Sequence, residues 1–143
     1  MSEPLYQVRR YGEKLGDYQM VDAWMRDHGR GVFQENLMPA LGFFVTCQEP
    51  GGVSAEDLAV GWLYLDNSIG VCQLDHFVTR PGLTVAQAYE AMQVLVGCLI
   101  KEARALNYGR VNVFTPPAIA RFLNRMGFTP QAEGLTMLTM NLY

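Results

Sequence analysis

The side chains best suited to chemistry in this 143-residue sequence are an adjacent aspartate and histidine, Asp75 and His76. Because a neutral imidazole accepts a proton near pH 7, His76 is a candidate general base. Both residues lie in the apolar run 71–78 (VCQLDHFV), which is typical of a β-strand. Strand alternation would direct them to opposite faces, so we expect at most one to reach a substrate. The alternative is a hydrogen-bonded, half-buried His76 beside a solvated Asp75.

Metal chemistry is not indicated by the cysteines and histidines. The three cysteines are widely spaced within apolar stretches, which is typical of reduced core residues. The sequence has two histidines and no paired cysteine motif, so a zinc site would need scattered ligands. We therefore expect no metal.

Composition limits the compartment and the partners. A net charge of −3 provides no basic field for nucleic acid, and no apolar run is long enough to span a membrane. The first residues lack the basic and apolar regions of a signal peptide, so we expect a cytoplasmic protein. Half of the residues are hydrophobic, which favours one domain over residues 1–143.

The elements that must position Asp75 and His76 follow from periodicity. Asp17 is expected to cap a first helix that ends at Gly29. Pro117 suits the first turn of a short helix that ends before Gly127. The expected strands cover residues 5–11, 43–47, 58–65, 71–78, 111–114 and 136–143.

A long helix is the strongest prediction. Thr84 and Gln87 form a Thr-x-x-Gln capping box, and an apolar stripe continues from Val85 to Leu106. Such a helix is about 33 Å long and can span a sheet. Because residues 111–114 follow this helix, they are expected to pair in parallel with the strand before it. The order predicts an α/β fold with a mixed central sheet and helices on both faces.

Residues 59–128 resemble the core of the GCN5-related N-acetyltransferase (GNAT) family. The most specific segments are residues 107–115 (NYGRVNVFT) and residues 121–128 (RFLNRMGF), which are similar to the last core strand and to the helix before the family's Gly-Phe turn. Residues 61–64, the Val-x-x-Pro at 78–81 and Met137-Leu138 also resemble short members carried by phages and prophages. The resemblance implies the GNAT fold.

The resemblance also implies acetyl-CoA as cosubstrate. In the family, the two central strands separate near a bulge, and pantetheine pairs with the exposed backbone of the second strand. Here that edge would run from residue 77 to 80 and use Phe77, Val78 and Thr79. The pyrophosphate would meet the turn before the long helix, where free N–H groups and the helix dipole attract anions. That turn consists of Leu83, Thr84, Val85, Ala86, Gln87 and Ala88.

Four positions depart from the family pattern. Leu83 cannot donate a side-chain hydrogen bond to phosphate, and Ala86 carries a Cβ where glycine is usual. The tyrosine that many members use to protonate the departing thiolate would fall at Leu123. The asparagine common after the last core strand would fall near Pro116.

Other side chains have two interpretations each. Arg121, one turn before Arg125, either meets the adenosine phosphate or is a solvated arginine. Within the implied mechanism, His76 or Asp75 would act as the base. Four aromatic residues either shape an acceptor pocket or belong to the core: Trp24, Trp62, Tyr64 and Tyr89.

Two functions remain open. The first is direct acetyl transfer from acetyl-CoA to a small-molecule or peptide amine, with a water chain replacing the missing tyrosine. The second is a GNAT-like binding or assembly module without catalysis. The loops at residues 30–42 and 131–134 would decide the acceptor, and the apolar final strand favours pairing in a homodimer.

Overall fold

The computed structural model describes residues 4–31, 34–48, 55–67, 70–140 and 142. It divides into two compact units, Met1–Val113 and Phe114–Tyr143. Among its described residues, the first unit contains the sheet, two α-helices, the short 3-10 helix η1 (Glu35–Leu37) and both predicted catalytic residues.

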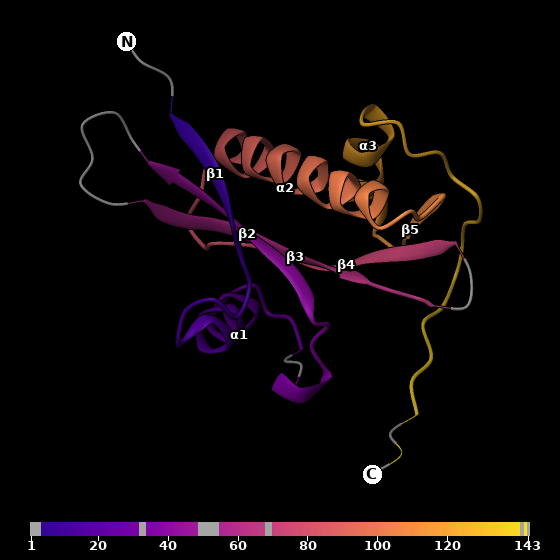
Figure 1. Ribbon diagram of the computed structural model, residues 1–143, viewed down its shortest axis with the longest axis horizontal. Helices are drawn as coiled ribbons and strands as arrows, with labels where there is room; N and C mark the ends of the chain where they lie inside the picture. Colours follow the sequence, from indigo (N-terminus) through magenta and orange to yellow (C-terminus); the bar gives the residue numbers. More distant parts are fainter. Residues whose placement is uncertain (1–3, 32–33, 49–54, 68–69, 141, 143) are drawn as a thin grey trace. The chain divides into compact units, whose positions relative to one another are not determined.

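The first unit is built on a five-stranded sheet in the order β1-β2-β3-β4-β5 (Figure 1). The first four strands are antiparallel to their neighbours, and β5 runs parallel to β4, as predicted. A crossover through a long helix produces this parallel pair. The bounds are β1 Leu5–Arg10, β2 Leu41–Gln48, β3 Glu56–Tyr64, β4 Val71–Thr79 and β5 Arg110–Val113.

Helices cover both faces of this sheet, with α1 (Asp17–Asp27) on one face and α2 (Val85–Ala105) on the other (Figure 1). Strand β2 is buried on both faces over seven of its eight residues, which explains its continuous apolar sequence. On the α1 face, the core combines helix and strand side chains: Val21, Trp24, Met25, Phe44, Val60, Trp62 and Val78. Trp24 and Trp62 are therefore core residues.

The predicted capping box of α2 is confirmed. Thr84 Oγ1 accepts from the Gln87 N–H at 3.1 Å, and Gln87 Oε1 accepts from the Thr84 N–H at 3.0 Å. These bonds satisfy two backbone donors and fix the start of the helix. No helix among the described residues is long and apolar enough to cross a membrane.

The prediction that Asp17 caps α1 is wrong. Gly16 occupies the cap with φ of 89°, and Asp17 is the first helical residue. Its carboxylate instead accepts two hydrogen bonds from the Arg9 guanidinium, at 2.8 and 2.9 Å, and one from the Gly12 N–H at 2.9 Å. Arg9 also donates to Asp57 at 2.9 and 3.0 Å, so one guanidinium joins β1, α1 and β3.

The second unit contains α3 (Pro117–Arg125), with proline in its first turn as predicted. The strand predicted at residues 136–143 does not form in residues 136–140 or at 142, and residues 141 and 143 lie outside the described part of the chain. Alternating apolar residues make a strand only when neighbouring backbone supplies hydrogen bonds. Met137, Leu138 and Met140 are accordingly exposed.

Candidate active site

A β-bulge in β4 creates the candidate site. Val60 pairs with Val78 but Trp62 pairs with Asp75, so Gly61 opposes two residues, His76 and Phe77. His76 has φ of 59°, in the left-handed region that histidine adopts more readily than most residues. Opposite the bulge, a Cβ on Gly61 would come within 2.7 Å of the Phe77 ring. Glycine at position 61 therefore makes room for Phe77.

The bulge overturns the expectation that Asp75 and His76 point to opposite faces. Asp75 is the cross-strand partner of Trp62, and the His76 ring lies 6.2 Å from the Trp62 ring. The His76 ring is also 5.5 Å from the Tyr64 ring, with Nε2 hydrogen-bonded to the tyrosine hydroxyl. The Asp75 carboxylate accepts a hydrogen bond from the backbone N–H of His76 at 2.7 Å. The side chains of Tyr64, Asp75 and His76 thus gather on the α1 face of the sheet.

The electrostatics suit a base at this position. Burial lowers the pKa of His76 below 6.5, and the charge of Asp75 opposes this shift only in part. Burial, assisted by Asp75, raises the pKa of the Tyr64 hydroxyl. The His76 side chain is 7% exposed, whereas Tyr64 is half-buried. A neutral imidazole therefore lies behind a neutral hydroxyl that is the more exposed of the two.

Beyond the bulge, β4 has an open backbone edge. The β4–β5 pairing ends at Leu74 and Val113, and no later pair of these strands forms among the described residues. On the other side, Arg80 donates its N–H to Leu58 O at 2.8 Å. By antiparallel alternation, Phe77 and Thr79 turn their N–H and C=O groups away from β3.

The strands that separate are therefore β4 and β5, and the expectation that the central hairpin opens is wrong. Strands β3 and β4 stay paired to Ala59 and Thr79 because antiparallel bonds continue past a bulge. Val78 is buried in the core and pairs with Val60, so its backbone faces β3. Of the predicted edge, Phe77 and Thr79 are open, whereas Val78 and Arg80 face β3.

The side chains of His28 and Arg30 cover part of the open β4 edge. His28 Nε2 lies 2.8 Å from Thr79 O, and the Arg30 guanidinium donates to Phe77 O. Both residues are exposed and follow the end of α1. The carbonyl groups of the edge thus have side-chain partners in this structure.

The predicted phosphate turn lies at the start of α2. Thr84, Val85, Ala86 and Gln87 are exposed, and Leu83 and Ala88 are half-buried. The capping box occupies the N–H groups of Thr84 and Gln87. Those of Val85 and Ala86 belong to the first turn, where a helix offers donors without intrahelical partners. This geometry suits an anion.

The remaining predicted positions belong to the second unit. Arg121 and Arg125 are both exposed on α3. Leu123 is buried, and Pro116 is the N-cap of α3. Neither Leu123 nor Pro116 supplies a polar side chain, as the sequence indicates.

Sequence reasoning missed Tyr64 as the partner of His76, and His28 and Arg30 as partners of the β4 edge. A glycine inside an apolar strand is a known signal for a bulge or a close approach, so Gly61 could have revealed the first contact. No local pattern indicates the other two, because His28 and Arg30 meet residues 51 and 47 positions away.

Comparisons with known proteins agree with this architecture. A Mycobacterium tuberculosis protein solved in complex with CoA is 21% identical, with a TM-score of 0.66 over 91% of this chain and 76% of its own. A probable acetyltransferase from Staphylococcus aureus is 9% identical, with a TM-score of 0.65 over 96% of this chain and 99% of its own. N-acetylglutamate synthase from Neisseria gonorrhoeae, complexed with coenzyme A and N-acetyl-glutamate, is 12% identical, with a TM-score of 0.59 over 87% of this chain and 28% of its own.

No protein-family model matches the sequence, and no curated protein matches it significantly. The similarity therefore lies in the structure. The mixed sheet with helices on both faces is the fold of the GNAT acetyltransferases, which confirms the predicted fold class.

Proposed function

We propose that this protein is an acetyl-CoA-dependent N-acetyltransferase that transfers acetyl directly to an amine. One observation carries the proposal: the β4 bulge places His76, which is hydrogen-bonded to Tyr64 of β3, directly before the open backbone of Phe77 and Thr79. A base and a backbone edge for the thioester arm are what direct transfer requires.

The cosubstrate would bind by backbone contacts. The pantetheine amides would pair with Phe77 and Thr79, and the pyrophosphate would meet the N–H groups of Val85 and Ala86. Solved structures of the same fold include two with CoA bound.

The acceptor amine would attack the thioester carbonyl carbon, so a C–N bond forms and the C–S bond then breaks. The proton lost by the amine nitrogen would pass to the Tyr64 hydroxyl, whose own proton moves to His76 Nε2. The CoA thiolate would leave and take a proton from water, and the hydroxide formed in this way would accept the proton held by His76. Asp75 would stabilise the imidazolium as it forms.

Calorimetry with acetyl-CoA tests the binding step. We expect a micromolar dissociation constant, weakened about tenfold or more by Ala86→Trp, because the indole would block the approach of the pyrophosphate. Ala105→Trp, at the exposed opposite end of α2, is the matched control and should change affinity less than about twofold. Equal effects of the two variants would contradict this site.

The contact between Arg30 and Phe77 O predicts a variant that binds acetyl-CoA more tightly, in contrast to Ala86→Trp. Pantetheine would have to displace this side chain, so Arg30→Ala should tighten acetyl-CoA binding by about 2- to 10-fold, the equivalent of one hydrogen bond. Arg26→Ala, whose guanidinium pairs with Asp22 within α1, serves as the control. A weaker affinity in Arg30→Ala would mean that Arg30 helps to hold the cosubstrate.

The same contacts favour a second candidate, a GNAT-fold module without catalysis. Leu83 and the covered carbonyl groups of Phe77 and Thr79 would both oppose CoA. The absence of acetyl-CoA binding at millimolar concentration, in the original protein and in Arg30→Ala, would favour this module.

A further inference from the structure

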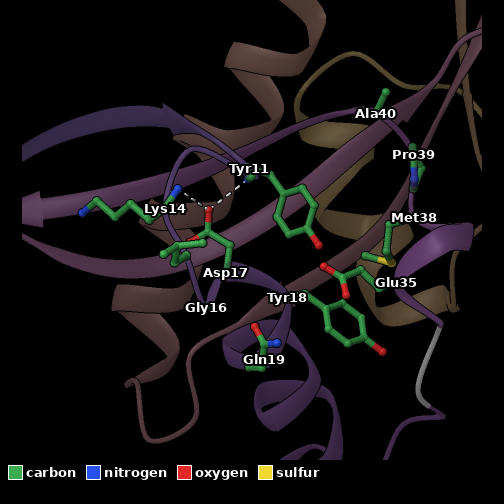
Figure 2. Close-up of a pocket in the computed structure, with 12 residues that line it drawn as sticks. Tyr11, Lys14, Gly16, Asp17, Tyr18, Gln19, Glu35, Met38, Pro39 and Ala40 are labelled. Atoms are coloured by element: carbon green, nitrogen blue, oxygen red, sulfur yellow. Dashed lines mark hydrogen bonds between the residues drawn. The ribbon is translucent and has the colours of Figure 1, made fainter.

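We propose that an open pocket beside α1 binds a second positive charge on the acceptor, so that the preferred substrates are diamines. The proposal rests on the acetyltransferase function. The pocket has a volume of about 460 Å³, and its walls come from the segment between β1 and α1, from the start of α1 and from residues 35–40 (Figure 2). Residues 30–42 are the region from which sequence analysis expected acceptor selection.

The pocket carries excess negative charge. Glu35 forms no salt bridge with any residue in the described ranges. Asp17 also lines the pocket, and it shares the single Arg9 guanidinium with Asp57, so two carboxylates face one cation. The only basic residue of the lining, Lys14, extends away from Glu35 in Figure 2. A cation entering the pocket would therefore be attracted.

Aromatic rings complete a site for ammonium. Tyr11 and Tyr18 lie on either side of the Glu35 carboxylate in Figure 2. Burial raises the pKa of the Tyr11 hydroxyl, and the charges of Glu35 and Asp17 add to this effect, which agrees with a negative potential there. A carboxylate beside tyrosine rings suits an ammonium group, because the ring faces are negative and the carboxylate supplies the counter-charge.

The pocket also lies on the face of the sheet that carries the base. The Tyr11 ring is 5.0 Å from the Trp62 ring, and the His76 ring is 6.2 Å from it. Tyr11 and His76 thus contact the same buried indole. In this proposal, a flexible diamine would place one nitrogen at Tyr64 and His76 and the other near Glu35, whereas a monoamine would leave the second position to water.

Cadaverine and pentylamine are suitable probes, because both have a five-carbon chain and only cadaverine carries a second amine. With saturating acetyl-CoA, we expect kcat/KM to be about tenfold higher for cadaverine, the equivalent of one partly exposed charge interaction. Glu35→Gln should bring the ratio of kcat/KM for cadaverine to that for pentylamine close to one. Glu13→Gln, an exposed acidic residue that does not line the pocket, should retain the preference.

A ratio near one in the original protein, or one unchanged by Glu35→Gln, would overturn the proposal. If neither amine is acetylated, the acetyltransferase function fails, and calorimetric titration of cadaverine without acetyl-CoA decides the pocket separately. Binding that is lost in Glu35→Gln and kept in Glu13→Gln would support the cation site, and no binding to the original protein would overturn it.

Discussion

Replacing His76 by asparagine is expected to lower kcat/KM for acetyl transfer by about 10²- to 10⁴-fold, the usual contribution of a general base. Asparagine is the suitable substitution because it tolerates the φ of 59° that the bulge imposes. The fold should survive, and an unfolding midpoint close to that of the original protein is the control. A variant that folds and keeps its activity within about threefold would remove His76 from the mechanism.

The pH profile gives the same hypothesis a second readout. Because burial lowers the pKa of His76, the neutral base persists below pH 6.5, and kcat/KM should fall only as the pH drops through that lowered pKa. Once the protonation of the amine itself is taken into account, His76→Asn should lack this decline. If His76→Asn shows the same decline of kcat/KM at low pH, the decline belongs to another titrating group.

Replacing Arg9 by methionine is expected to lower the free energy of unfolding by about 3 kcal/mol, because it strands two carboxylates that share its charge. The side chain of Arg9 is 10% exposed and that of Asp17 is 5% exposed, so solvent compensates little. Methionine keeps an apolar stem against the Phe44 ring, over which the guanidinium lies at 4.1 Å. Urea unfolding measures the difference in the free energy of unfolding. Arg10→Met, which replaces the exposed neighbouring arginine, is the matched control.

This loss should depend on pH. Burial alone would raise the pKa of Asp17, but hydrogen bonds from Arg9 and from the N–H groups of Lys14 and Gly12 outweigh it, and the pKa is lowered. A lowered pKa contributes stability above the unfolded value near 3.8, and that stability is lost as the pH falls through the folded value. The difference in stability between the two proteins should therefore shrink as the pH falls below about 3.8, and it should disappear below the lowered pKa of Asp17 in the folded protein. A constant difference would contradict the role of the ion pair.

Local signals predicted much of this fold. The Thr84–Gln87 box fixed the start of α2 because its hydrogen bonds join residues three positions apart. Pro117 marked the first turn of α3, because proline has a helical φ and its missing N–H has no partner in that turn. The parallel β4–β5 pair followed from the length of α2, since a crossover needs a helix of that kind.

What sequence reasoning missed depends on distant partners. Strand alternation predicted that Asp75 and His76 point to opposite faces of the sheet. The bulge adds one residue to β4 relative to β3 and brings the two side chains to the same face. Asp17 was taken for a cap because its partner Arg9 belongs to another element. The strand predicted at residues 136–143 does not form in its described residues, because alternation alone supplies no neighbouring backbone.

Amide hydrogen exchange by NMR, with and without CoA, tests most directly whether the segment after the bulge holds the cosubstrate. Exchange at the Phe77 and Thr79 amides should slow about tenfold or more when CoA binds, while Arg80, already bonded to Leu58, should change little. Saturating CoA that leaves Phe77 and Thr79 unchanged, or that protects a different segment, would contradict this site.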